Sequence, residues 1–385
     1  MTERLADLMR RAVDDLPVPP APSAEVLRHG HDVRRHRGYA VVAGTFAAVL
    51  VASGIGVAAT GGDSGGDGGD GTGRDRQVQA ADIAGGLTGP VFSIGTTVYL
   101  DGGTRTATID DTAIKSLYYT SAGVVVRHGN NNYSDGGGPM RFSLVAPDGA
   151  VSPLDVTFEE TVPSTDPDQP YLAYAEKVDG VVQVVVLDVR DGSEAARVPV
   201  PDAKKWGGWS APPVSLDGDL VYVGTDDVQR VVNWRTGEVS TSDAVGPGFP
   251  DVRDGHAVTS SDRTSAVIDV ATGSILALGK KNEYLNLSPD GRYALGQTYD
   301  PQDPQARLVD LASGADVPLD IKGNGLGWSP EDSVFALTGS DLTTCRADTG
   351  ACTTTTLTLP VVPDSNPADQ SFDDDLRLGG MTYES

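Results

Sequence analysis

The sequence predicts an all-β outer domain built from a repeated unit of four short strands. Between Ala81 and Ser385 no segment has the apolar spacing of a convincing amphipathic helix. A polar turn that ends in glycine recurs through this stretch, at Gly149, Gly192, Gly237, Gly273, Gly314 and Gly350. Successive turn glycines are 43, 45, 36, 41 and 36 residues apart. A period of about 40 residues is the spacing of β-propeller blades.

A second turn alternates with the first, between the first and second strands of each unit. It contains Asp217-Gly218, Asp254-Gly255 and Asp290-Gly291, and a degenerate copy runs from Trp328 to Leu337. Such a tight turn needs a residue that tolerates positive φ, and Asp-Gly supplies one. The alternation of the two turns predicts a regular array of four-stranded units.

These residues resemble a known family at two places. Ser288 to Leu295, together with Gly327-Trp328-Ser329-Pro330, is similar to the propeller repeats of TolB-type and WD-like proteins. The resemblance covers about Pro90 to Leu359 and implies a propeller, but propellers of this pattern serve as binding platforms, envelope-complex subunits or accessory domains of peptidases. The turns also resemble quinoprotein repeats, although the aromatic residue expected after them is absent. We therefore expect no quinone and no other cofactor.

Counting the units predicts seven blades, with six or eight as alternatives. The predicted blades are residues 88–112, 113–157, 158–203, 204–245, 246–283, 284–322 and 323–360. The first unit is one strand short. The segment from Leu376 to Gly380 is predicted to supply that strand and so to close the ring, which leaves only short, protected edges.

The segment from Gly38 to Gly61 predicts a membrane span ahead of this domain. It contains no charged residue, histidine or proline, and its 24 residues would extend ~36 Å as a helix, enough to cross the ~30 Å hydrocarbon core. Arg28, Arg34, Arg35 and Arg37 precede it, so the positive-inside rule places the N-terminus in the cytoplasm. A signal peptide cleaved near Val57-Ala58-Ala59 is the alternative; its apolar core is usually shorter.

The sequence thus divides into four parts. Residues 1–37 form a cytoplasmic segment, 38–61 the transmembrane helix, 62–80 a flexible linker rich in glycine and aspartate, and 81–385 the outer domain. Thr2 to Leu16 has the apolar spacing of an amphipathic helix and ends at Pro17. That helix is too small to bury its own apolar stripe, so it must dock on a partner, lie on the membrane or stay partly disordered.

Charge argues against nucleic acid as a partner. The chain has 29 basic and 54 acidic residues. Of these, 7 basic and 6 acidic residues precede Gly38, and no charged residue lies between Gly38 and Gly61. The part beyond the span therefore has 22 basic and 48 acidic residues. Such a surface repels phosphate and lacks the basic patches that nucleic-acid binding needs. The abundance of Gly, Ala, Val and Asp beside few lysines is typical of a GC-rich bacterial genome.

The two cysteines predict a disulfide. Cys345 and Cys352 flank a turn centred on Asp348-Thr349, so they would lie opposite each other in a hairpin. An oxidising compartment outside the membrane favours the bond, and two free structural thiols are the alternative. No histidine cluster accompanies them, so a zinc site is not expected.

The sequence has no recognisable catalytic or metal-binding motif, which favours a binding role. Ser210 and Ser329 begin like a nucleophile elbow but lack its second glycine, and the outer domain has only His128 and His256, so we expect no enzyme. We interpret the acidic clusters Asp166–Asp168, Asp300 with Asp303, and Asp373–Asp375 as solvated loops rather than calcium sites. Trp206, Trp209 and Tyr171, with Tyr174, are candidates for an aromatic ligand platform, and blade-core packing is the alternative.

We therefore expect a single-pass plasma-membrane protein whose outer propeller binds a protein, a peptide or an envelope glycan. The alternative is transmembrane signalling, in which the outer domain controls a cytoplasmic regulator held by residues 2–16. The order of domains resembles that of membrane-bound anti-sigma factors, although the cytoplasmic segment is shorter than their sigma-binding domains and has no zinc motif.

Overall fold

A computed structural model describes most of the outer domain. The described residues are 86–131, 138–158, 160–203, 206, 209–261, 264–298, 306–321, 325–359 and 376–381. The predicted cytoplasmic segment, membrane span and linker lie outside them and stay predictions. Within the described residues no helix is long and apolar enough to cross a membrane.

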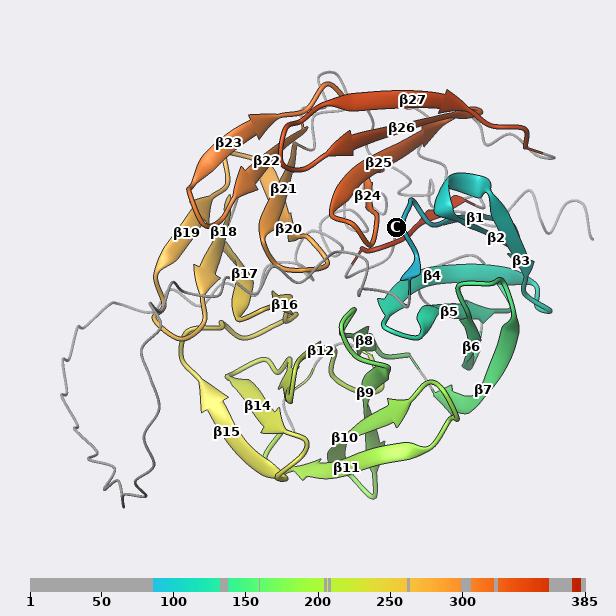
Figure 1. Ribbon diagram of the computed structural model, residues 1–385. Helices are drawn as coiled ribbons and strands as arrows, with labels where there is room; N and C mark the ends of the chain where they lie inside the picture. The colour runs from blue at the N-terminus through green and yellow to red at the C-terminus, as the bar shows by residue number, and fades with distance from the viewer. Residues whose placement is uncertain are drawn as a thin grey trace, which may run out of the picture. The chain divides into compact units, whose positions relative to one another are not determined.

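The described strands form seven antiparallel four-stranded sheets that follow one another around a ring (Figure 1). This confirms the predicted seven-bladed propeller. From the centre outward, blade 1 contains β28 (Leu376–Leu378), β1 (Phe92–Ile94), β2 (Thr97–Leu100) and β3 (Arg105–Thr108), with a short 3-10 turn, η2 (Asp101–Gly103), after β2. Blade 2 contains β4 (Ala113–Thr120), β5 (Gly123–Gly129), β6 (Met140–Val145) and β7 (Val151–Phe158).

The other five blades keep the same order from centre to rim. Blade 3 contains β8 (Ser164–Thr165), β9 (Tyr171–Val178), β10 (Val181–Asp188) and β11 (Glu194–Val200). Blade 4 contains β12 (Val214–Asp217), β13 (Leu220–Val223), β14 (Gln229–Asn233) and β15 (Glu238–Ser242). Blade 5 contains β16 (Val252–Arg253), β17 (His256–Ser261), β18 (Thr264–Asp269) and β19 (Ile275–Leu278). Blade 6 contains β20 (Glu283–Leu287), β21 (Tyr293–Thr298), β22 (Ala306–Asp310) and β23 (Ala315–Pro318). Blade 7 contains β24 (Gly327–Trp328), β25 (Ser333–Thr338), β26 (Asp341–Arg346) and β27 (Cys352–Thr356).

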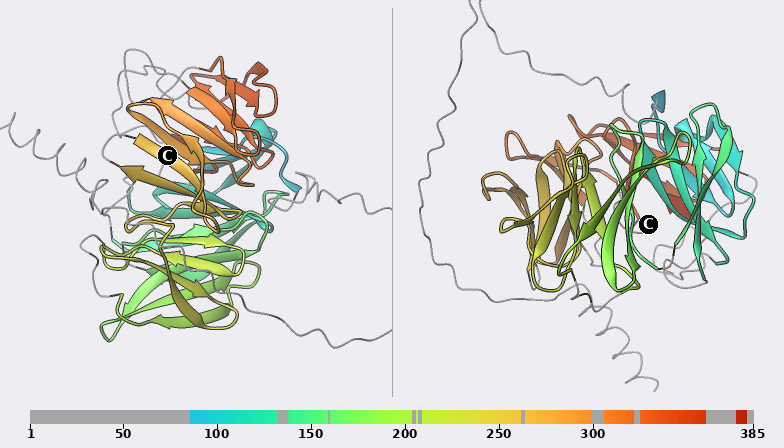
Figure 2. Two further views of the ribbon diagram at one scale, coloured as in Figure 1. Left: turned by 90° about the vertical axis from the view of Figure 1, so that its left-hand side faces the viewer. Right: turned by 90° about the horizontal axis from the view of Figure 1, so that it is seen from below.

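The strands run between two faces of the ring (Figure 2). Because neighbouring strands are antiparallel, the turns after the first and third strands of each blade share one face, which we call the turn face. The opposite face carries the connections between second and third strands and between successive blades, and we call it the crossover face. The chain enters β1 and leaves β28 on the turn face, since Phe92 pairs with Leu378 and Ile94 with Leu376.

The hydrophobic core lies between the blades. Side chains alternate along a strand, so each blade contributes to two cores. In β4, Tyr118 packs towards blade 3 while Tyr119 packs towards blade 1. In β10, Val184 packs towards blade 4 and Val185 towards blade 2. Among the described residues every junction between neighbouring blades holds one such apolar cluster.

The ring closes through β28, as predicted. It pairs with β1 as the innermost strand of blade 1, and Leu378 enters the apolar cluster between blades 7 and 1 beside Phe92 and Phe335. The following turn is tied on both sides: the Gly379 N–H donates to the Val91 carbonyl at 2.8 Å, and the Gly379 carbonyl accepts the Trp328 N–H at 3.0 Å. The two ends of the propeller are thereby joined.

Polar side chains tie the innermost strands of blades 3, 4 and 5 together. The Ser164 hydroxyl accepts the Leu216 N–H at 3.0 Å, and the Ser215 hydroxyl accepts the Val252 N–H at 3.1 Å. At the turn face the Asp217 carboxylate accepts the N–H groups of Asp254, at 2.8 Å, and Gly255, at 3.0 Å. These bonds satisfy backbone groups that the short inner strands leave unpaired.

The predicted disulfide is present. Cys345 and Cys352 lie directly opposite each other on β26 and β27, with their Cα atoms 4.0 Å apart. Cys345 is fully buried in the apolar cluster between blades 6 and 7. The bond therefore attaches the rim strand of blade 7 to a core position.

A buried carboxyl, that of Asp332, lies beside the partly exposed Asp290 between blades 6 and 7. Asp332 follows β24 with φ of +57°, and its Oδ1 atom is 3.4 Å from the Asp290 backbone nitrogen, which donates to it. Burial, and then the charge of Asp290, raise the pKa of Asp332 to about 9. Both effects favour the protonated form of the Asp332 carboxyl.

Replacing the closing leucine tests the importance of β28. We expect Leu378→Ala to lower the free energy of unfolding by about 2–5 kcal/mol, because it opens a cavity in the cluster between blades 7 and 1. Leu278→Ala, at an exposed position on β19, is the matched control and should change it little. Denaturant unfolding of the full chain in detergent measures both, and equal effects would contradict the closure argument.

Replacing Asp332 tests the carboxyl pair. Its folded pKa lies above its unfolded value, so its contribution to stability is complete below about pH 4 and is lost as the pH rises through about 9. Asp332→Asn keeps the left-handed backbone accessible and cannot ionise. We expect this variant to gain at least about 1 kcal/mol over the wild type between about pH 5 and about pH 8. Urea titrations across this range measure the gain, with Asp148→Asn in an exposed turn as control; parallel curves for wild type and variant would refute it.

Candidate functional site

Three aromatic side chains gather on the crossover face at blades 4 and 5. Trp206 and Trp209 lie in the connection from β11 to β12, and Phe249 lies in the connection from β15 to β16. The ring centroid of Phe249 is 5.5 Å from that of Trp206 and 5.0 Å from that of Trp209, both in edge-to-face contact, and the two tryptophans are 6.2 Å apart. Phe249 is 36% exposed and the tryptophans are half-buried. We call these three residues the aromatic patch.

Close backbone contacts hold the Phe249 side of the patch. The Gly248 N–H donates to the Thr225 carbonyl at 3.0 Å, which joins this connection to the loop between β13 and β14. Gly224 lies where these two loops meet, and a Cβ atom on Gly224 would come within 2.1 Å of the Gly248 carbonyl oxygen. Only glycine permits this approach. Phe249 is thus presented by a loop that packs directly on blade 4.

The Trp209 side of the patch is tied to the preceding crossover. The Ser210 N–H donates to the Glu160 carbonyl at 3.0 Å, and the Thr161 hydroxyl donates to the Pro212 carbonyl at 3.1 Å. The described part of the chain contains no acceptor for the buried indole N–H of Trp206. The patch therefore combines exposed ring surface with one polar group, on loops held by the ring.

Tyr171, the third predicted platform residue, does not join the tryptophans. It begins β9 on the turn face, where its ring contacts Trp234 edge-to-face at 5.0 Å. The guanidinium of Arg235 lies 4.1 Å from the Trp234 ring centroid and forms an ion pair with Asp219. Tyr174 is buried in the cluster between blades 2 and 3. Both tyrosines therefore pack at junctions between blades, and Phe249 completes the patch instead.

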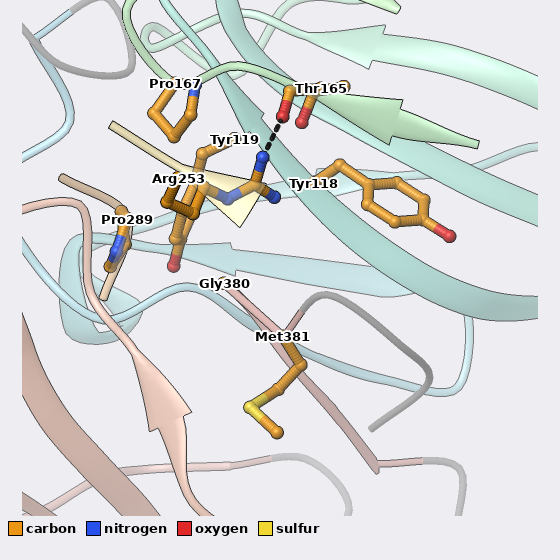
Figure 3. A pocket seen from close by; sticks show the side chains of 8 residues that line it. All are labelled: Tyr118, Tyr119, Thr165, Pro167, Arg253, Pro289, Gly380 and Met381. Atoms are coloured by element: carbon orange, nitrogen blue, oxygen red, sulfur yellow. Dashed lines mark hydrogen bonds between the residues drawn. The ribbon is translucent and has the colours of Figure 1, made fainter. Parts of the chain in front are cut away.

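A small pocket opens at the centre of the turn face (Figure 3). Arg253 projects into it from β16, and its Nη1 atom donates to the carbonyls of Thr165, at 2.7 Å, and Leu216, at 3.2 Å. Arg253 thus bridges the innermost strands of blades 3, 4 and 5. Tyr119, Pro167, Pro289 and Met381 line the same pocket (Figure 3), in which the Arg253 guanidinium is the principal charge.

Carboxylates surround this pocket, but their oxygens are used by the fold. Asp166 accepts the N–H groups of Gly218 and Asp168, and burial raises its pKa although these bonds and the nearby charge of Arg253 oppose the rise. Burial, and then the charge of Asp217, also raise the pKa of Asp254. Among the described residues no group of three His, Cys, Asp or Glu side chains could hold a metal ion. The predicted clusters at Asp300 and Asp303 and at Asp373–Asp375 lie outside those residues.

A serine, a histidine and an aspartate form a relay that the sequence did not predict. Ser143 Oγ is 3.0 Å from His128 Nε2, and His128 Nδ1 is 2.5 Å from Asp111 Oδ2. Arg141 donates to both oxygens of Asp111 at 2.7 Å. Burial alone would raise the pKa of Asp111, but the bonds from Arg141 and His128 outweigh it and hold that pKa well below its ordinary value.

This relay has the order of a catalytic triad but little access for a substrate. Ser143 is 4% exposed and lies with His128 between blades 1 and 2. Asp111 comes from the connection between those two blades. We interpret the relay as a polar tie across the junction. The sequence offered one clue, a histidine and a serine on adjacent strands of one hairpin, but the aspartate comes from the connection that precedes blade 2.

Chemical labelling tests this interpretation. We expect a fluorophosphonate to leave Ser143 unmodified in the folded full chain, because the reagent cannot reach a serine this deeply buried. Intact mass spectrometry measures the labelling, with a known serine hydrolase as positive control. An adduct on the wild type that is absent from Ser143→Ala and from His128→Gln would instead identify a nucleophile.

Comparison with known proteins finds similarity at the level of the fold. No family model matches this chain, and no curated protein matches it. AztD from Citrobacter koseri is 10% identical, with a TM-score of 0.47 over 76% of this chain and 99% of that one. TolB from Acinetobacter baumannii is 12% identical, with a TM-score of 0.40 over 77% and 68%. Kuenenia stuttgartiensis hydrazine synthase is 17% identical, with a TM-score of 0.41 over 64% and 80%. These similarities do not indicate what this chain binds.

Proposed function

We propose that this chain is a binding or scaffold module whose propeller holds a protein, a peptide or an envelope glycan outside the plasma membrane. The aromatic patch is the observation that carries the proposal. Tryptophan and phenylalanine are enriched at binding surfaces because they bury a large area at little cost in conformational entropy. Trp206, Trp209 and Phe249 present such area on loops of a rigid ring, as binding proteins commonly do.

The direction in which the chain enters the propeller supports a tethered arrangement. The residues that lead into β1 lie on the turn face, where the Thr88 N–H donates to Asp101 at 2.8 Å. The aromatic patch lies on the opposite face. The described chain therefore begins on the face that does not carry the patch, which is compatible with an anchor at residues 38–61 and a linker at 62–80. A partner could then reach the patch while the chain stays anchored.

Crosslinking at the patch tests this function. A photoreactive amino acid in place of Phe249, in the full chain in its native envelope, should capture a protein or glycan that mass spectrometry identifies. Once the partner is known, chains without the photoreactive group are compared for how much of that partner they recover. We expect Trp209→Ala to recover about tenfold less than the wild type, or even less, because truncation of a buried interface aromatic commonly has this effect.

The control is Val181→Ala, which changes an exposed apolar residue on the same face. Circular dichroism of each variant confirms that the propeller remains folded. Equal recovery with Trp209→Ala and Val181→Ala, or capture no greater than from an unrelated anchored domain, would contradict a binding role for the patch.

A further inference from the structure

The outer strand of blade 5 differs from the outer strands of the other blades. β19 has the sequence Ile275-Leu276-Ala277-Leu278, and Ile275 and Leu278 are 65% and 63% exposed, the largest values among the described large apolar residues. The other outer strands contain charged residues, prolines or runs of serine and threonine. Such residues protect the edge of a sheet from pairing with another chain. β19 has no such residue.

A bulge places both exposed side chains on the same face of the strand. Ile275 pairs with Ile268 of β18, but Ala277 pairs with Val267, so Leu276 is an extra residue between them. Leu278 then pairs with Ala266, two positions from Ile268. Because alternate positions share a face, Ile275 and Leu278 form one continuous apolar surface at the rim of the ring. Without the bulge they would lie on opposite faces.

The outer edge of β19 has no neighbouring strand in the described part of the chain, as its place at the rim shows (Figure 1). The Leu278 carbonyl accepts the Nη2 group of Arg307 at 3.0 Å, which fixes the end of the strand against blade 6. Arg307 is itself neutralised by Glu283 and Asp316. An edge of this kind pairs readily with an extended segment of another chain.

Two lysines follow the strand after Gly279. Lys280 and Lys281 are exposed, and neither forms an ion pair with a described residue. The backbone N–H of Lys280 donates to Glu283 Oε2 at 2.6 Å, which holds the loop beside the end of β19. In a chain with only seven lysines and a net charge of −25, two adjacent cations that have no ion-pair partner among the described residues form a local site for carboxylates beside an apolar edge.

We infer that β19, with Lys280 and Lys281, binds an extended acidic segment of a partner protein. Apolar side chains of that segment cover Ile275 and Leu278, and its carboxylates pair with the two lysines. A second copy of this chain fits less well, because it would bring a net charge of −25 against the same charge. This site lies on the rim and does not depend on the aromatic patch.

A designed peptide tests the inference on the full chain in detergent. The probe is a fluorescent peptide that alternates valine with glutamate, and its counterpart alternates valine with lysine. We expect the acidic probe to bind and to slow hydrogen exchange of backbone amides in β19, whereas the basic probe should not. Lys280→Glu with Lys281→Glu should weaken binding of the acidic probe by about tenfold or more, and Leu278→Lys should abolish the protection of β19.

The matched control is Thr354→Lys, at an exposed position on the outer strand of blade 7, which should bind the probe as the wild type does. Absence of binding by the acidic probe, or binding that Leu278→Lys leaves intact, overturns the inference. Sedimentation of the unliganded chain gives a further test. A dimer that Leu278→Lys dissociates would show that a second copy is the occupant, which also overturns it. None of these outcomes affects capture at Phe249, so the two proposals can fail separately.

Discussion

The antiparallel pairing of β28 with β1 is the interaction on which the ring depends. Each blade covers its apolar side chains with the next blade, so an open array would leave two exposed apolar faces, one on blade 1 and one on blade 7. The pairing brings Leu378 between them, and the bonds of Gly379 to Val91 and Trp328 tie the two blades to the same turn. β28, which lies far from β1 in the sequence, thereby joins the seven sheets into a single closed ring.

Closure allows the connecting loops to carry function. Each blade contributes apolar side chains to the cores on both of its sides, so stability comes from the junctions between blades. Polar ties add to this framework. The relay of Asp111, His128 and Ser143 joins blades 1 and 2, and Arg253 joins the inner strands of blades 3 to 5. Both resemble functional sites in composition, yet their hydrogen bonds connect parts of the fold.

The surface has three regions of different chemistry. The turn face carries carboxylates whose oxygens accept backbone N–H groups of neighbouring turns, as Asp166 and Asp217 do. The crossover face carries the aromatic patch, and the rim carries the apolar edge of β19 beside Lys280 and Lys281. The three regions therefore differ in the side chains that they present to the surroundings.

The sequence by itself predicted seven blades, with six or eight as alternatives, and also the closing strand and the disulfide. The blade number and the disulfide follow from local turn chemistry, whereas the closing strand was expected because the first unit is one strand short. An Asp-Gly pair sets a tight turn wherever it occurs, and Cys345 and Cys352 are opposite once their hairpin forms. Only the tertiary structure decided which side chains meet. Tyr171 lies on the turn face, whereas Phe249 joins Trp206 and Trp209 across a junction between blades. The sequence also did not predict the relay at Ser143 or the bulge at Leu276. These features depend on how neighbouring blades pack and on single-residue shifts of register. The repeat pattern of the sequence specifies neither, so it could not predict them.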